Sequence, residues 1–110
     1  MSQAARNTAS LYRIDRFDVP AAALEAFMER LRQVQQALDP QPGCLQNLVL
    51  AQPGDGGDTR VVTLVEWASA EAAADAKAVM QQRYAQEGFD PPAFMKRLGV
   101  RADFGAYRNA

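Results

Sequence analysis

Two short apolar segments constrain the fold of this chain more than any other feature, because each is hydrophobic on both of its alternating sides. Residues 44–52 and 59–67 have the alternation and the length of β-strands. The segment between them, Pro53–Asp58, contains three glycines and is typical of a hairpin loop. We therefore predict an antiparallel hairpin whose strands carry apolar side chains on both faces of a sheet.

These apolar rows require that both faces of the sheet be covered. In residues 59–67, alternation puts Val61, Val65 and Trp67 on one face and Val62 and Leu64 on the other. In residues 44–52, it puts Leu48 and Leu50 on one face and Leu45 and Val49 on the other. A face open to water would carry polar residues, and leaving this one uncovered would expose roughly several hundred Å² of apolar surface. We predict a homodimer in which a second copy covers the face that the helices leave open. The alternative is that the C-terminal strand and the N-terminal residues fold over that face.

The rest of the chain divides into further strand and helix patterns. The predicted elements are strands at 11–19 and 100–108 and helices at 20–38, 70–87 and 91–98. The first helix should begin at Pro20, where a missing N–H is tolerated. Ser69 and Asp90 are suitable N-caps for the other two helices, and Gly88 and Gly99 are suitable residues to end them.

This order of elements predicts an α+β fold of the ferredoxin-like βαββαβ type, a sandwich in which the helices cover one face of a four-stranded antiparallel sheet. A length of 110 residues suits a single domain. We place that domain at residues 11–108, after a flexible lead-in formed by residues 1–10.

The balance of charge argues against two classes of partner. The net charge is −1 and the longest basic run is Lys96-Arg97, so the field that gathers nucleic-acid phosphates is missing. RNA-recognition domains share the βαββαβ order but need aromatic and basic residues on the open sheet face. No apolar run approaches the roughly 20 residues that span a bilayer, and residues 1–10 lack the apolar core of a secretory signal. We expect a cytoplasmic protein that binds neither nucleic acid nor membrane.

The sequence has no histidine and a single cysteine, Cys44. These counts exclude a Ser-His-Asp or Cys-His nucleophile, a histidine-ligated metal or haem, an internal disulfide and a multi-cysteine metal site within this chain. Cys44 is either a small residue that fills space at the start of a strand or a reactive thiol. We expect no metal and no cofactor.

Several segments resemble a known family. They are Phe17–Pro20, Pro42–Leu45, Val65–Ala72, Gly88–Pro91 and Arg101–Tyr107. Together they resemble the antibiotic biosynthesis monooxygenase family of the dimeric α/β-barrel superfamily, over roughly residues 11–108. The resemblance implies that two protomers pack their sheets face to face, as a dimeric α/β barrel. It also implies that each protomer forms a cleft between its sheet and its helices.

Characterised members of that family oxidise phenolic or quinol-like polycyclic substrates with O2 and without flavin, metal or haem. The resemblance therefore implies a cofactor-independent monooxygenase that acts on a small aromatic, quinol or polyketide-like molecule in an apolar cleft. The alternative is a homodimer of the same fold that only binds a small molecule or has a structural role. The family's haem-degrading branch binds iron through a histidine, which this chain lacks, and many relatives have a histidine where this chain has Gln35-Gln36.

The resemblance and the chemistry of the side chains nominate substrate-binding candidates, and none is assigned as catalytic. The candidates are Trp67, Asn47, Tyr12, Arg13, Tyr84 and Arg83. Trp67 maps onto a family motif, with Asn47 as a looser match; the others are aromatic groups or hydrogen-bond donors suited to holding substrate oxygens. Each has a structural alternative. Trp67 would pack in the core or at an interface, and Tyr84 would pack in the core. Asn47 would form a hydrogen bond across an edge or an interface, and Tyr12 would be a sheet residue. Arg13 would pair with Asp15, and Arg83 would face solvent.

Overall fold

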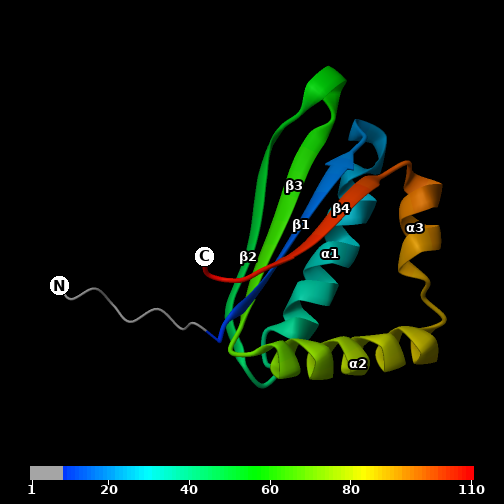
Figure 1. Cartoon of the computed structure of the whole chain (residues 1–110). Helices are drawn as coiled ribbons and strands as arrows, with labels where there is room; N and C mark the ends of the chain where they lie inside the picture. Colours follow the sequence, from blue (N-terminus) through cyan, green and yellow to red (C-terminus); the bar gives the residue numbers. More distant parts are fainter. Residues whose placement is uncertain (1–8) are drawn as a thin grey trace.

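A computed structural model describes residues 9–110 as a four-stranded antiparallel sheet with its helices on one face (Figure 1). The strands are β1 (Leu11–Val19), β2 (Cys44–Pro53), β3 (Thr59–Trp67) and β4 (Arg101–Tyr107). The helices are α1 (Leu24–Leu38), α2 (Ala70–Glu87) and α3 (Pro91–Leu98), with 3₁₀ turns η1 (Ala21–Ala23) and η2 (Asp55–Gly57). The predicted α+β ferredoxin-like fold is confirmed. The predicted flexible lead-in lies largely outside the described residues.

The strands pair in the order β2-β3-β1-β4, so that β1 and β3 form the centre of the sheet. Most element boundaries agree with the sequence prediction within a residue or two. The start of the first helix is the exception: Pro20 has an extended ψ of 146°, and a 3₁₀ turn precedes α1 at Leu24. Pro20 therefore stands before the first helical turn instead of beginning it.

The ends of α2 and α3 are set by side-chain caps. The Ala72 N–H donates to the Ser69 hydroxyl at 3.0 Å, and the Ala93 N–H donates to the Asp90 carboxylate at 3.2 Å. Gly88 ends α2 with a φ of +67°, a left-handed conformation that glycine adopts readily. These local signals account for the α2–α3 corner, which brings α3 back towards the sheet (Figure 1).

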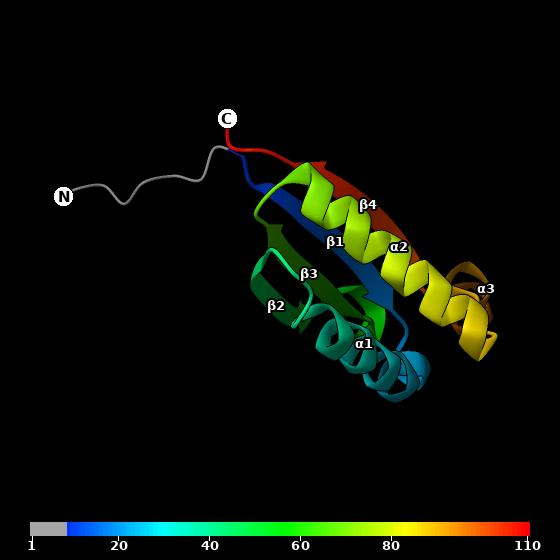
Figure 2. The same ribbon diagram turned by 90° about the horizontal axis from the view of Figure 1, so that it is seen from below.

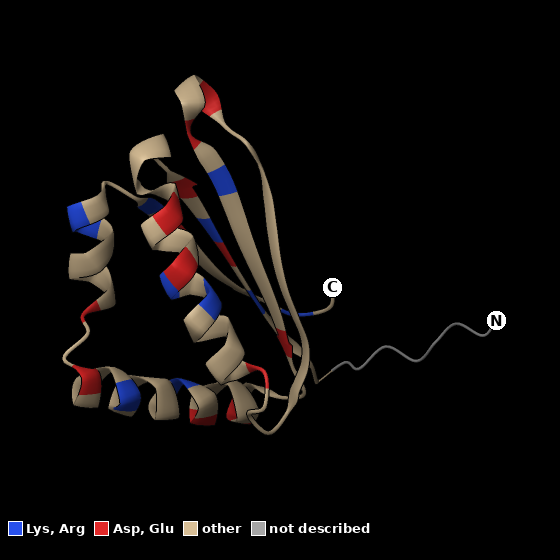
Figure 3. Ribbon diagram, turned by 180° about the vertical axis from the view of Figure 1, so that it is seen from behind, with Lys and Arg blue, Asp and Glu red and all other residues tan. Residues whose placement is uncertain are grey.

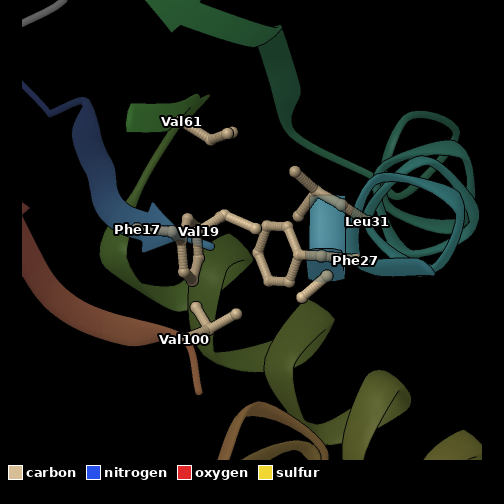
Figure 4. Close-up of a cluster of buried hydrophobic side chains, with 7 residues drawn as sticks. Phe17, Val19, Phe27, Leu31, Val61 and Val100 are labelled. Carbon is tan, nitrogen blue, oxygen red and sulfur yellow. The ribbon is translucent and has the colours of Figure 1, made fainter. Parts of the chain in front are cut away.

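A first apolar cluster closes one end of the space between sheet and helices. It comprises the buried residues Phe17, Val19, Ala23, Phe27, Leu31, Val61 and Val100. Figure 4 shows side chains from β1 and β3 meeting those of α1. The rings of Phe17 and Phe27 are 5.1 Å apart in a tilted arrangement, which is favourable for aromatic pairs.

A second apolar cluster lies at the opposite end of the same sheet face. Its buried members are Val65, Trp67 and Ala76, and Leu11, Leu38, Cys44, Ala72 and Ala73 pack against them. The register places Leu11 of β1 opposite Trp67 of β3. The apolar core is therefore interrupted in the middle of the helix-facing side, between Leu11 and Phe17.

The face without helices is apolar at its centre, as predicted. Val62 and Leu64 are only partly covered, and Leu48 and Leu50 are 38% and 52% exposed. The register sets Ile14 beside Leu64 on this face, whereas Val61 and Val65 are buried on the other. One detail differs from the prediction: a bulge between Cys44 and Gln46 removes Leu45 from the regular ladder.

Charged pairs border this open apolar face. Asp18 lies 3.5 Å from Arg60 and 3.7 Å from Arg101, and Arg16 pairs with Asp103. Ser10 is also ordered at this border: it is buried and donates to Glu66 at 2.7 Å. In the rest of the described chain, charges of both signs are spread over the helices and strands (Figure 3).

The helices all lie on the other side of the sheet, which the view along the strands makes plain (Figure 2). Helix α1 runs alongside the strands, α2 leaves from the end where Trp67 lies, and α3 returns alongside α1 (Figure 1). None of the helices in residues 9–110 has the length and hydropathy that a membrane span requires.

Candidate functional site

A cleft of about 700 Å³ lies between the sheet and the three helices. Strands β1, β3 and β4 form its floor, and α1, α2 and α3 form its walls. Its aromatic lining residues are Phe17, Phe27, Trp67, Tyr84, Phe89, Phe94 and Phe104. A concave site with this apolar lining and a few polar groups is the usual form of a small-molecule site.

Polar residues occupy the middle of the floor. Arg13 and Asp15 are consecutive inward positions of β1, and Arg13 Nη2 donates to Asp15 Oδ1 at 3.0 Å. The register places Thr63 of β3 directly opposite Asp15, and Thr63 is buried. The side chains of Arg13 and Asp15 remain 36% and 20% exposed. The floor thus presents an ion pair between the two apolar clusters.

Arg13 has hydrogen-bonding capacity that its surroundings leave unused. Its Nε is buried and has no hydrogen-bond partner among residues 9–110. Most buried donors in folded proteins are paired, so an orphaned one is an unusual feature that calls for a reason. The Arg13–Asp15 contact satisfies a different atom of the guanidinium, Nη2.

Trp67 forms one end wall of the cleft. It is the only tryptophan in the sequence and is 3% exposed, packed in the second apolar cluster. It also belongs to the cleft lining. The two roles expected from the sequence, packing and cleft lining, occur together.

An aromatic cluster from α2 and α3 lines the outer part of the cleft. Tyr84 and Phe89 have ring centroids 5.4 Å apart, and Phe89 and Phe94 are 5.3 Å apart. From α1, the Arg30 guanidinium carbon lies 3.8 Å from the centre of the Phe89 ring. Burial raises the pKa of the Tyr84 hydroxyl above its ordinary value, so this group stays neutral well into the alkaline range.

Asn47 does not line the cleft but contacts a residue that does, and its hydrogen bonds hold α1 in place. It accepts a hydrogen bond from Gln35 Nε2 at 2.7 Å and donates to the Gln35 backbone carbonyl at 2.9 Å. Gln35 itself lines the cleft and is buried. Asn47 therefore fixes Gln35 twice, once through its neutral side-chain amide and once through its backbone carbonyl.

The structure brings three of the six predicted site residues together and separates the other three. Arg13, Trp67 and Tyr84 line the cleft, and Asn47 reaches it only through Gln35. Tyr12 points to the opposite face of the sheet, where the register sets it beside Glu66. Arg83 is exposed on α2 and pairs with Glu87 at 3.4 Å.

Sequence reasoning did not assign Asp15 and Thr63 to the site. Both could have been found from strand alternation, since Asp15 has the parity of Leu11 and Phe17, and Thr63 that of Val61 and Val65. Phe89 had no such signal, because its position depends on the angle of the α2–α3 corner.

The described residues hold no cluster of three or more histidine, cysteine, aspartate or glutamate side chains suited to a metal ion. Cys44 packs against the second apolar cluster, outside the cleft lining. Burial, followed by the nearby Asp39 carboxylate, raises the pKa of its thiol. A raised pKa lowers the thiolate fraction, which favours the interpretation of Cys44 as a packing residue.

Residues 10–87 match the model of a protein family described as antibiotic biosynthesis monooxygenase. The chain belongs to this family. The match covers β1 to α2, which include most of the cleft and the whole of its floor except β4. The resemblance expected from the sequence is thereby confirmed. No functionally curated protein matches this family member significantly.

Solved structures similar to this family member share its fold at low sequence identity. A proposed monooxygenase from Shewanella loihica PV-4 is 22% identical, with a TM-score of 0.71 over 93% of this chain and 95% of that one. SnoaB, a cofactor-independent oxygenase from Streptomyces nogalater crystallised as a mutant, is 22% identical, with a TM-score of 0.65 over 92% and 93%. A dimeric ferredoxin-like protein from an uncultured marine organism is 12% identical, with a TM-score of 0.69 over 92% and 95%.

Proposed function

We propose that this protein is a cofactor-independent monooxygenase that oxidises a small aromatic phenol or quinol in the cleft between its sheet and helices. The observation that carries the proposal is a large cleft with aromatic walls and a single ion pair on its floor, in a member of a monooxygenase family. The similarity to a cofactor-independent oxygenase supports the absence of a bound redox group.

Such a reaction requires no redox group from the protein, because the substrate supplies all the electrons. A deprotonated quinol is electron-rich and reacts with O2 to form a hydroperoxide at a ring carbon. Loss of water from the hydroperoxide leaves one oxygen atom in a new carbonyl. The quinol thus loses four electrons in all, and O2 is reduced to one water and one carbonyl oxygen. The protein has to bind the substrate, exclude water and stabilise the deprotonated form.

The cleft meets these needs with separate groups. Its aromatic rings provide stacking surfaces for a planar molecule. The Arg13 guanidinium lies on the floor as a hydrogen-bond donor to substrate oxygen, and Tyr84, kept neutral by its raised pKa, is a second donor. Trp67 closes the end of the cleft against solvent.

Oxygen uptake with a panel of naphthols, anthrones and hydroquinones tests this proposal. The wild-type protein, free of flavin and metal, should consume O2 with at least one of them. Trp67→Ala should lower kcat/KM by about tenfold or more by opening the end wall, whereas Arg83→Ala on the outer surface of α2 should not. If no substrate in the panel is oxidised faster than in buffer, the proposal is wrong.

We also propose that the functional unit is a homodimer packed through the open sheet faces. The partly exposed row formed by Val62, Leu64, Leu48 and Leu50 needs a cover, and the bordering charged pairs would form a polar rim around it. A two-fold axis lets the same face serve on both copies. The dimeric nature of a similar structure supports this arrangement.

A second candidate function is ligand binding without chemistry, which the neutral Gln35–Asn47 pair favours. In this case the cleft would hold a metabolite, and the Gln35 side chain would serve only to fix α1. Thermal shift with a metabolite library separates the two functions. A binder would be stabilised by its ligand and leave it unchanged in air, whereas an oxygenase would convert it.

A further inference from the structure

The proposed oxidation begins with removal of a proton from the substrate hydroxyl, and the chain has no histidine to accept it. The titratable residues that line the cleft are Arg13 and Asp15 from β1, Arg30 from α1, and Lys77 and Tyr84 from α2. The residues of β3, β4 and α3 that line it are not titratable. Asp15 is the only carboxylate in this set.

Asp15 lies where a proton acceptor would be useful. It shares the floor with Phe104 of β4 and Thr63 of β3, its two partners in the sheet register. Its hydrogen bond from Arg13 uses Oδ1, so within the described residues Oδ2 is left for a ligand. At 20% exposure, its side chain is reachable from the cleft but largely shielded from bulk water.

Arg13 complements Asp15 as the group that would hold the resulting anion. Only its Nη2 is engaged by Asp15, and its Nε is an orphaned donor already removed from water. A modest rotation of this flexible side chain would turn Nε and an Nη group towards the cleft as a fork, the geometry in which arginine binds oxyanions. A bound phenolate oxygen would satisfy the donor that the described residues leave unpaired.

We propose that Asp15 and Arg13 form an acid–base dyad in which Asp15 Oδ2 takes the proton of a bound phenol and Arg13 donates hydrogen bonds to the phenolate oxygen. This inference rests on the proposed function. The O–H bond of the substrate breaks, an O–H bond forms on Asp15, and its electron pair stays on the substrate oxygen. The total charge of the cleft does not change, because Arg13 exchanges a carboxylate partner for a phenolate.

The dyad also defines the class of substrate. An ordinary phenol has a pKa of about 10 and an ordinary aspartic acid a pKa of about 4, so the transfer is uphill by about six units unless the anion is stabilised. Hydrogen bonds from Arg13 in a water-poor cleft reduce this difference. A carbonyl group conjugated with the phenol reduces it further. The preferred substrates should therefore be phenols or enols made acidic by a neighbouring carbonyl.

A structural ion pair is the competing interpretation of Arg13 and Asp15. In that case the pair would only neutralise the floor of the cleft, and the bound phenol would keep its proton. The two interpretations differ in where the phenolic proton is found after binding. This can be measured without oxygen, so that the result does not depend on turnover.

The decisive experiment binds a nitrophenol, whose phenolate absorbs in the visible range, under anaerobic conditions about one pH unit below its own pKa. Quenching of the single tryptophan, Trp67, reports occupancy of the cleft. Phenolate absorbance reports ionisation of the ligand, and a pH indicator in weak buffer reports protons released. The wild type should give phenolate absorbance with much less than one proton released per ligand, because Asp15 retains the proton.

Variants of the dyad should separate its two roles. Asp15→Asn resembles protonated Asp15, so it should still bind phenolate but release about one proton per ligand to the buffer. Arg13→Gln should bind the ligand in its neutral form. Glu29→Gln, which changes an exposed carboxylate of α1 outside the cleft lining, should behave as wild type. Arg13→Lys provides a second, more conservative variant, with weaker ionisation expected, should Arg13→Gln fold poorly.

Turnover of the same variants gives a second readout. Asp15→Asn should lower kcat/KM by about 100-fold below the pKa of the substrate, and the loss should shrink as the pH rises through that pKa. A wild type that binds the phenol without ionising it, or that releases as many protons as Asp15→Asn, would overturn the dyad. Ionisation without any oxygen uptake would instead preserve the dyad and contradict the proposed oxygenase function.

Discussion

At the scale of single residues, Gly43 is held in a position that other residues tolerate poorly. Its φ is +85°, and a Cβ built there would lie 2.6 Å from the Cβ of Ala72 on α2. The backbone carbonyl of Gly43 also accepts a hydrogen bond from the Ala68 N–H at 2.8 Å. This bond connects the start of β2 to the end of β3. The close approach of α2 to this turn fixes one end of the cleft wall.

We expect Gly43→Ala to destabilise the protein by about 2 to 4 kcal/mol, from the combined cost of a positive φ and of overpacking. The free energy of unfolding in urea measures this effect. Gly57→Ala is the matched control, because Gly57 has a φ of +89° but nothing within 4 Å of its Cβ position. Equal losses in the two variants would show that the contact with Ala72 is unimportant.

Tyr84 provides an expectation about pH. Burial raises the pKa of its hydroxyl above the ordinary value of 10.0, so the folded state holds this proton more tightly than the unfolded state. The resulting stabilisation is complete below pH 10 and is lost as the pH rises towards the folded-state pKa. Ultraviolet difference titration of the wild type against Tyr84→Phe should show Tyr84 ionising above pH 10. A transition at or below pH 10 would contradict its burial.

The candidate site was predictable in part, because strand alternation and helix packing differ in what a sequence reveals. Arg13 and Trp67 alternate with core residues, so their inward direction could be read directly. The same alternation places Tyr12 with Ile14 on the opposite face, so the sequence already argued against Tyr12 as a cleft residue. Arg83 and Tyr84 are neighbours on α2, and only the packing angle of that helix determines that Tyr84 lines the cleft while Arg83 does not.

At the scale of elements, Arg30 joins α1 to the corner between α2 and α3. Its guanidinium stacks over Phe89 and lies 3.4 Å from a carboxylate oxygen of Glu87. Arg30 thus links α1 to the end of α2, and Phe89, whose ring lies 5.3 Å from that of Phe94, extends the link to α3. The contact explains how α3 is held although it has no buried residue of its own.

We expect Arg30→Ala to destabilise the protein by about 1 kcal/mol, through loss of the cation–π contact. Hydrogen exchange should quicken selectively in α3 and at the end of α2. Arg83→Ala is the matched control, since Arg83 pairs with the same Glu87 but is not seen to stack on a ring. Similar exchange rates in both variants would show that the faster exchange comes from loss of the ion pair with Glu87 and not from loss of the contact with Phe89.

The elements themselves were largely predictable, because their boundaries depend on local chemistry. Ser69, Asp90 and Gly88 act within one turn of the chain, and the structure uses them as expected. The course of α2 was not predictable. Only Ala76 and Met80 are buried in this alanine-rich helix, so its sequence has no strong apolar stripe to specify which face packs and at what angle.

At the scale of the whole molecule, the two apolar faces of β3 should respond differently to charge. Val61 and Val65 are buried under the helices, whereas Val62 and Leu64 lie on the open face. We expect Val62→Asp with Leu64→Asp to yield folded monomers, and Val61→Asp with Val65→Asp to unfold the domain. Light scattering and circular dichroism measure the two outcomes. A monomeric wild type would refute the dimer.

Element order and two-sided strands were enough to predict the architecture, because a sheet with helices on one face has few alternatives. The chemistry could not be predicted in the same way. The cleft exists because the inward-facing residues between Leu11 and Phe17, Arg13 and Asp15, are polar where the ends of the sheet are apolar. Its size depends on how far α2 and α3 stand from the floor.

The most direct test of the proposed function is a turnover under ¹⁸O2 with protein freed of metal and flavin. A monooxygenase that uses its substrate as the only reductant should place one ¹⁸O atom in each product molecule, and the other in water. Mass spectrometry of the product and a peroxide assay measure this outcome, and no hydrogen peroxide should accumulate. A product that lacks ¹⁸O, formed together with peroxide, would contradict the account.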